Sequence, residues 1–293
     1  MPKLPLTSRS ELARRARRSS SALLCAVCVA AISIACTGLG LSSTPSGVDA
    51  GNEPIAEVSA EAIAAVERMS AFIASRSSLG FTAEIQYDAI QSSGQKLEFG
   101  SERRIILRRP SRARVSVTHW DGAEELMVFD GKRLSVALPE QRIYASVAFE
   151  GTASQAFDHL VDEHNVASPL SDLLSADLPK HVKSRTISAL DLGTVTIGGV
   201  RSDHYAFHGE RVDFQIFIRQ GDEPVPLRFV IDYHAEPGSP QFRAQLRDWE
   251  LDASPPDSLF RFAPVTGAQR VPFAELLDLL LGPEDPELVE EDL

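Results

Sequence analysis

The stretch at residues 198–233, GGVRSDHYAFHGERVDFQIFIRQGDEPVPLRFVIDY, decides the fold. It predicts three consecutive antiparallel strands, because apolar and polar residues alternate along it between glycine-containing turns. Every second side chain of a strand faces the same side of its sheet. The positions predicted to face inward are Phe214, Ile216, Ile218, Leu227, Phe229 and Ile231.

Strand patterns also lie on both sides of this stretch. Residues 81–147 alternate in the same way and are interrupted by turn residues such as Gly94 and Gly131, which predicts a meander of about seven short strands. Strand signals resume at Val182 and continue through residues 243–251. An antiparallel sheet with one face in the core is typical of such alternation.

Helical patterns are fewer. Residues 59–75 place apolar side chains at a period of 3.6, with Ser59 as the predicted cap of the first turn. An insert at residues 152–175 predicts two short helices, and residues 273–281 predict another. The order of elements predicts one α+β domain over residues 57–275, in which helices cover one face of a large curved antiparallel sheet.

The first 36 residues predict export. Arginines at positions 14–18 precede an apolar run at residues 22–35, which is too short to span a bilayer comfortably. Ser33-Ile34-Ala35-Cys36 resembles a lipobox, so we expect residues 1–35 to be an export signal and Cys36 to be lipidated. An ordinary signal peptidase could use the same site, and the choice between the Sec and Tat routes stays open.

Two segments outside the domain predict unfolded chain. Residues 36–56 are rich in Gly, Ser, Thr and Pro, which predicts a flexible tether. Residues 282–293 are acidic and contain proline, which predicts a disordered tail. The predicted location is therefore the periplasm or the outer membrane, through a lipid anchor.

The charge of the chain excludes nucleic acid as a partner. The whole chain carries a net charge of −12. Residues 1–35 contain six basic residues and one acidic residue, so the remainder has 23 basic and 40 acidic residues, a net charge of −17. Binding to nucleic acid is driven largely by Lys and Arg.

No catalytic or metal-binding constellation stands out, and no cofactor is expected. The cysteines, Cys25, Cys28 and Cys36, all lie in the export segment. His204 and His208 share one face of a strand but are about 13 Å apart, too far to bind one zinc ion. His119 and His234 have no evident partner in the sequence. G-x-S-x-G is absent, and the glycines of the central stretch belong to hairpin turns.

The apolar residues favour a different role. Phenylalanines gather in the central strands, where they fill the core under the helices. A curved sheet with a helical lid can also enclose an apolar cavity for a lipid-like ligand. We therefore interpret the six inward positions named above as candidate cavity residues.

Six motifs of the chain are specific enough to compare with a known family: RRPSRARV (108–115), FDGKRLSV (129–136), SPLSDLL (168–174), IGGVRSDHYAF (197–207), VDFQIFIRQGDEPVPLRFVI (212–231) and PQFRAQLRDWEL (240–251). Together they resemble one family of exported bacterial proteins, DUF2092, and the resemblance covers residues 59–270. Three residues depart from the family pattern: Trp is expected at Phe214 and Phe217, and Cys is common at Arg201.

The family is similar in turn to the lipoprotein-localisation factors LolA and LolB. This resemblance implies an unclosed antiparallel β half-barrel with helices on its concave side. It brings no catalytic residues. The leading hypothesis is a non-catalytic envelope protein that binds a lipid or a lipoprotein acyl chain. A sensor or protein-interaction module is the second hypothesis, and an envelope hydrolase, which a cleft with converging His and carboxylate groups would favour, is the third.

Overall fold

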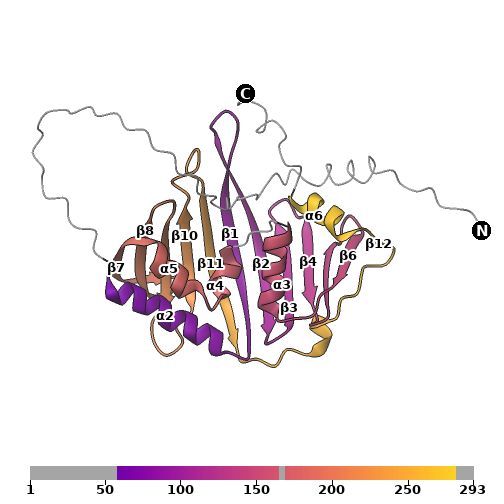
Figure 1. Ribbon diagram of the computed structural model, residues 1–293, viewed down its shortest axis with the longest axis horizontal. Helices are drawn as coiled ribbons and strands as arrows, with labels where there is room; N and C mark the ends of the chain where they lie inside the picture. The colour runs from indigo at the N-terminus through magenta and orange to yellow at the C-terminus, as the bar shows by residue number, and fades with distance from the viewer. Residues whose placement is uncertain (1–57, 165–168, 282–293) are drawn as a thin grey trace, which may run out of the picture.

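The computed structural model describes residues 58–164 and 169–281 (Figure 1). The predicted export signal, Cys36, the tether and the acidic tail lie outside these residues. Among the described residues, no helix is both long enough and apolar enough to cross a membrane.

The strands form one twelve-stranded sheet in the order β12-β6-β5-β4-β3-β2-β1-β11-β10-β9-β8-β7. Neighbouring strands are antiparallel except β12 and β6, which are parallel. The strands are β1 (Ser78–Ile90), β2 (Lys96–Arg108), β3 (Arg112–His119), β4 (Glu124–Phe129), β5 (Arg133–Leu138), β6 (Ile143–Ala148), β7 (Thr186–Ile197), β8 (Val200–Gly209), β9 (Asp213–Arg219), β10 (Pro226–Asp232), β11 (Gln241–Leu251) and β12 (Gln269–Arg270).

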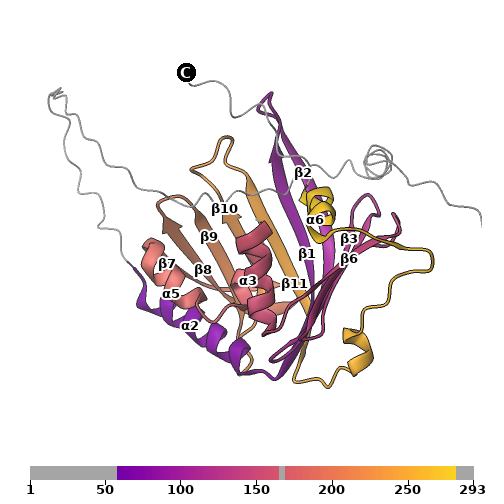
Figure 2. The same ribbon diagram turned by 45° about the vertical axis from the view of Figure 1, so that its right-hand side comes forward.

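The sheet is curved and does not close, and helices fill its concave side. Figures 1 and 2 show α2, α3, α4 and α5 on the same side of the sheet, within its curve, and α6 beside one end of β4 and β6. The predicted α+β half-barrel is therefore confirmed. The helices are α2 (Ala60–Ser75), α3 (Ala153–His164), α4 (Pro169–Leu174), α5 (Leu178–Arg185) and α6 (Phe273–Leu281), with a 3-10 turn η1 (Asp257–Phe260).

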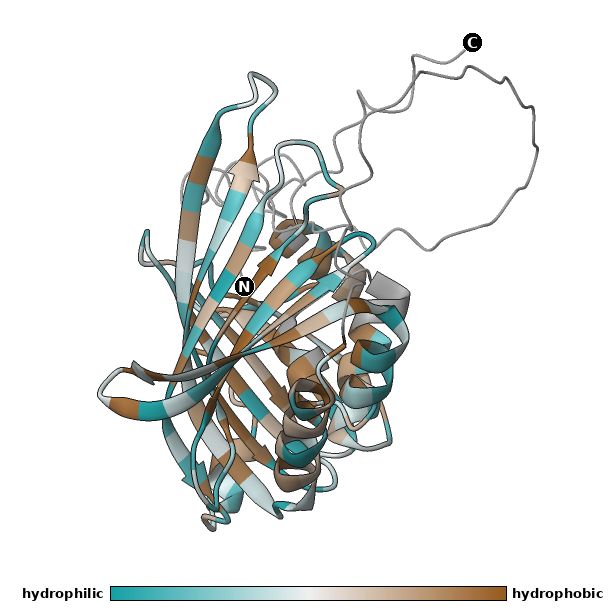
Figure 3. Ribbon diagram, turned by 90° about the vertical axis from the view of Figure 1, so that its left-hand side faces the viewer, coloured by the Kyte–Doolittle hydropathy of each residue, from teal (hydrophilic) through white to brown (hydrophobic). Residues whose placement is uncertain are grey.

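The main core lies between the sheet and these helices. Alternation along the strands, visible as brown and teal bands in Figure 3, gives the sheet an apolar concave face and a more polar outer face. The core includes Phe81 and Ile85 of β1 together with Met69 and Ile73 of α2. A smaller core lies under α6, where Leu276 packs with side chains of β5 and β6.

Helix α2 follows its predicted pattern. The Ser59 hydroxyl accepts a hydrogen bond from the Ala62 amide at 3.2 Å, which caps the first turn. The helix then buries Ala62, Val66, Met69 and Ile73 along the face that the 3.6-residue period predicted. Burial of this stripe, more than intrinsic propensity, holds the helix in place.

Two predictions about the elements were wrong in detail. Strand structure does not resume at Val182, because residues 178–185 form α5, whose one buried side chain, Val182, belongs to the main core. Helix α5 packs against α2, so tertiary contact stabilises a segment whose local pattern is short and ambiguous. The meander before the insert has six strands, β1 to β6, where about seven were predicted.

The central stretch folds as predicted into β8, β9 and β10. The register sets Phe214 opposite Ile231 and Ile216 opposite Phe229. Strand β11 follows and pairs with β1, so the last long strand of the chain joins the first one in the middle of the sheet. The pairing of β11 with β1 joins the two runs of strands into one continuous concave face.

Candidate functional site

The six candidate cavity residues lie near the middle of the β7-side half of the sheet. Ile216, Ile218 and Phe229 are buried members of the main core, and Phe214 and Ile231 pack against it. The same core contains Leu173 of α4 and Val182 of α5, which come from helices on the concave side. These five residues face the concave side as alternation predicted, and their contact with a ligand stays a prediction.

Leu227 differs from the other five. The β9–β10 ladder is irregular between Pro226 and Arg228, so the strict alternation that placed Leu227 inward is interrupted there. Leu227 is buried but belongs to neither core. A bulge of this kind leaves no clear signal in the alternation of a short strand.

A second part of the concave face lies over β2 to β6. Some of its apolar side chains, such as Ile105 and Phe129, are buried, and others are only partly buried where they pack against the main core. Alternation in these strands is as clear as in β9 and β10, but the sequence alone did not single them out as a site. We call this set the apolar floor: Phe99 of β2, Val115 of β3, Met127 of β4, Val147 of β6, with Phe157 of α3 and Phe273 of α6.

Two polar side chains of β2 face the same concave side. The register pairs Arg103 with buried Ala83 and Ser101 with buried Ile85. The Ser101 hydroxyl and Arg103 Nε are buried and have no hydrogen-bond partner among the described residues. Leaving a buried polar group unsatisfied costs on the order of 1–3 kcal/mol, so such groups point to a ligand or to water.

A histidine and a carboxylate lie beside them. His119 is the register partner of Ser101, and its Nε2 lies 2.8 Å from Oε1 of Glu125. The sequence had suggested no partner for His119, because the two residues come from adjacent strands joined by a turn. The pair places a polar group at one border of the apolar floor.

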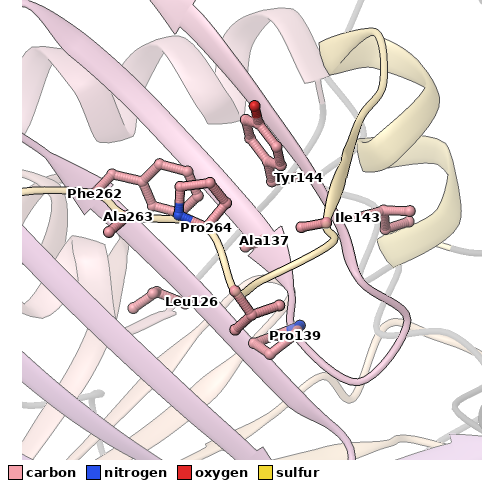
Figure 4. Close-up of a pocket in the computed structure, with 10 residues that line it drawn as sticks. Leu126, Ala137, Pro139, Ile143, Tyr144, Phe262, Ala263 and Pro264 are labelled. Atoms are coloured by element: carbon pink, nitrogen blue, oxygen red, sulfur yellow. The ribbon is translucent and has the colours of Figure 1, made fainter.

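The outer face carries a small pocket (Figure 4) between strands β4 to β6 and the segment that follows η1. Leu126, Ala137 and Tyr144 line it on the sheet side, and Phe262 and Pro264 on the other. Its volume is about 20 Å³, which is room for about one water molecule. A ligand site for a lipid needs several hundred Å³, so this pocket is not a lipid site.

The histidines of β8 have different surroundings. His204 stacks on Phe217 with ring centroids 4.1 Å apart, and its Nε2 lies 2.9 Å from Oε1 of Gln215. His208 instead meets Asp213 and His234, two residues that the sequence did not connect with it. The interpretation that His234 lacks a partner was therefore wrong.

Burial perturbs one tyrosine of the main core. Tyr205 on β8 is 3% exposed, and its pKa is raised to about 12. Desolvation is the largest cause, and the negative charges of Asp203 and Asp191 add to it. The phenol therefore stays neutral at ordinary pH.

Comparison of the sequence with models of known protein families identifies one matching family. The model of the family DUF2092, described as predicted periplasmic protein, matches residues 62–274. No curated protein matches the chain.

Three solved structures show partial similarity at low sequence identity. Lipoprotein LppX from Mycobacterium tuberculosis shares 14% identity over 64% of this chain and 94% of its own, with a TM-score of 0.41. The MucA/MucB complex from Pseudomonas aeruginosa shares 16% over 70% and 62%, with a TM-score of 0.41. A LolA superfamily protein from Nitrosomonas europaea shares 13% over 69% and 97%, with a TM-score of 0.35.

Proposed function

This chain belongs to the DUF2092 family of predicted periplasmic proteins, and from that premise we propose that it is a non-catalytic envelope protein that binds a lipid or a lipoprotein acyl chain on its concave face. The family assignment agrees with the export predicted from residues 1–35. The observation that carries the proposal is the partly exposed apolar floor on the same concave face as Arg103, whose Nε is buried and has no hydrogen-bond partner among the described residues.

The apolar floor suits the chain of an amphiphile. Val115, Met127 and Val147 lie on β3, β4 and β6, so together they span most of this part of the sheet. Burying about ten methylene groups at about 0.8 kcal/mol each contributes about 8 kcal/mol, which corresponds to micromolar affinity before ordering costs. Binding of this kind needs no catalytic group.

Arg103 suits the head of the same ligand. Its guanidinium forms no ion pair or hydrogen bond with any described residue, although its Nε is buried. A carboxylate or phosphate accepts hydrogen bonds from guanidinium in a bidentate geometry. We therefore propose an anionic amphiphile, with its acidic head at Arg103 and its chain on the apolar floor.

The test uses the purified full chain and a fluorescent fatty acid. Val115→Gln places a polar amide on the apolar floor and is expected to weaken binding about tenfold, because it removes apolar contact and adds a group without a partner. Thr118→Gln, on the same strand but with an exposed side chain on the outer face, is the matched control. Absence of copurifying lipid together with no uptake of the probe by the wild type would reject the proposal.

Membrane attachment is proposed to come from Cys36. A diacylated Cys36 would hold the domain on the outer membrane, with residues 36–56 as the tether. Mass spectrometry of the mature amino terminus tests this directly. A lipid-modified cysteine as the first residue supports the anchor, and an unmodified terminus shows a protein that is free in the periplasm.

A protein partner is the second candidate function, and the edge of the sheet favours it. Strand β7 is the last strand on its side, and Ile187, Leu190 and Leu192 on it are about half exposed. Among the described residues, Val58 forms one isolated parallel bridge with Ala189 on this edge. Exposed edge strands can pair with a strand of another protein. Crosslinking that recovers one stoichiometric partner, lost in Leu190→Lys, would favour this function over lipid binding.

A further inference from the structure

Two histidines and an aspartate converge on the outer face of the sheet, where β8 ends, β9 begins and the chain leaves β10. Nδ1 of His208 lies 2.6 Å from Oδ1 of Asp213, and Nε2 of His234 lies 3.5 Å from the same oxygen. The three ligand atoms all lie within 4.8 Å of one another. Each side chain is a third to a half exposed, so the cluster is open to solvent on one side.

A second carboxylate faces this cluster. Asp232 is the register partner of Asp213 across β9 and β10, so the two carboxylates lie on the same face of adjacent strands. Its Oδ1 is buried without a hydrogen-bond partner. Like charges directly across a strand pair repel each other. Among the described residues, neither aspartate forms an ion pair with a lysine or an arginine.

The backbone holds these groups in place. The β8–β9 turn is closed by a hydrogen bond from the Gly209 amide to the Val212 carbonyl at 3.0 Å. The turn after β10 is tied to it, because the Ala235 amide donates to the Arg211 carbonyl at 3.2 Å. Two turns from different parts of the chain therefore present the three ligands at fixed positions, even without an ion.

We infer that His208, Asp213 and His234 bind a divalent transition-metal ion of the Zn²⁺ class, with solvent as the remaining ligand and Asp232 as an outer negative charge. Two imidazoles and one carboxylate are a donor set that such ions prefer. Ligand atoms at bond lengths of about 2.0–2.1 Å in a tetrahedral site are about 3.3 Å apart, close to the observed 3.5 Å between His234 and Asp213.

Binding the ion needs only small rearrangements. His208 Nδ1 and Asp213 Oδ1 must separate by about 0.7 Å from their hydrogen-bonded distance of 2.6 Å to reach that spacing. His234 Nε2, which donates to the Gly209 carbonyl at 3.1 Å, gives up that hydrogen bond. Each neutral imidazole carries its proton on the other ring nitrogen when it binds the metal. The ion then links the β8–β9 turn to the turn after β10.

The experiment measures Zn²⁺ binding to the full chain by calorimetry, with the absorption spectrum of Co²⁺ as a second readout. Cys25, Cys28 and Cys36 can bind the same ions, so the measured quantity is the binding that is lost on changing the cluster. His234→Ala and Asp213→Asn are each expected to weaken this binding at least tenfold. Asp232→Asn is expected to weaken it about tenfold, since outer groups of metal sites typically contribute 10–100-fold.

His204→Ala is the matched control, because this histidine lies on the same strand and the same face as His208 but outside the cluster. It is expected to leave the affinity unchanged. Zn²⁺ is also expected to raise the Tm of the wild type and not that of His234→Ala. Equal Zn²⁺ binding by the wild type and His234→Ala overturns the assignment. The assignment is also overturned if the substitutions change stability while the wild type takes up no Zn²⁺, and the three residues then form an ordinary ion pair.

Discussion

Arg103 lies directly opposite Ala83 in the β1–β2 ladder, so a guanidinium group faces the apolar side of the sheet. Its neighbour in sequence, Arg104, faces the outer side and donates to Oε1 of Glu250 at 2.5 Å. One strand thus presents two arginines in opposite surroundings, of which Arg104 is paired and Arg103 has no hydrogen-bond or ion-pair partner in the part of the chain that the structure describes. This contrast makes the role of Arg103 testable.

Arg103→Met is expected to reduce binding of an anionic amphiphile at least tenfold, equivalent to about 1.4 kcal/mol. The free energy of unfolding should stay unchanged or rise by up to about 1 kcal/mol, because the change removes an unsatisfied buried group. Fluorescent fatty acid titration and urea unfolding measure the two effects. Arg104→Met should leave binding unchanged, and equal effects of both changes would argue against a head group at Arg103.

Arg243 makes an ion pair that should matter for stability. It donates to Oδ1 of Asp88 at 2.5 Å, and both side chains are mostly buried. Arg243→Met is expected to lower the free energy of unfolding by about 2 kcal/mol, because it leaves the buried Asp88 carboxylate with only the more distant Lys96, at 3.8 Å, as a charge partner. Urea denaturation measures the loss.

The control for this change lies on the same strand and face. Arg247 pairs with Glu102 and Asp248, but all three side chains are about half exposed. Arg247→Met is therefore expected to cost less than about 1 kcal/mol. Equal losses at the two positions would show that burial does not set the strength of these ion pairs.

Ile216 tests whether the predicted cavity residues also support the core. It is 2% exposed, so Ile216→Ala is expected to lower the free energy of unfolding by about 3 kcal/mol through lost burial and a new cavity. The adjacent exposed residue gives the comparison, since Gln215→Ala should change stability by about 0.5 kcal/mol or less. A small loss at Ile216 would mean that this part of the concave face is open, and not packed.

The raised pKa of Tyr205 predicts that the folded protein loses stability at alkaline pH. Its pKa of about 12 in the folded protein lies above the ordinary value of 10.0, so the folded state holds the proton more tightly. The resulting stabilisation is fully present below pH 10 and is lost as the pH rises from about 10 to about 12.

The matching experiment compares unfolding of the wild type and Tyr205→Phe across this window. Other groups titrate there too, so the difference between the two proteins is the quantity of interest. The wild type is expected to lose up to about 2 kcal/mol more than the variant. Parallel pH profiles would show that Tyr205 titrates as it does in the unfolded chain.

The central strands show which features of the fold the sequence predicts. Phe214, Ile216, Phe229 and Ile231 lie on the face that alternation predicted, because one buried face of a sheet forces apolar residues onto every second position. Helix α2 follows for the same reason at a period of 3.6. The bulge at Leu227 and the helix at residues 178–185 were not predictable in this way, since contacts with other strands and with α2 decide them.

The sequence by itself determined the alternating strands, the capped helix α2 and the family resemblance, because all three depend on neighbours along the chain. Only the tertiary structure decided what those strands bring together. Pairing of β2 with β1 and β3 placed Arg103 and Ser101 on an apolar face, and pairing of β9 with β8 and β10 joined His208, Asp213 and His234. Contacts between residues on different strands cannot be predicted from the sequence pattern, because strand register and turn geometry set the distances between them.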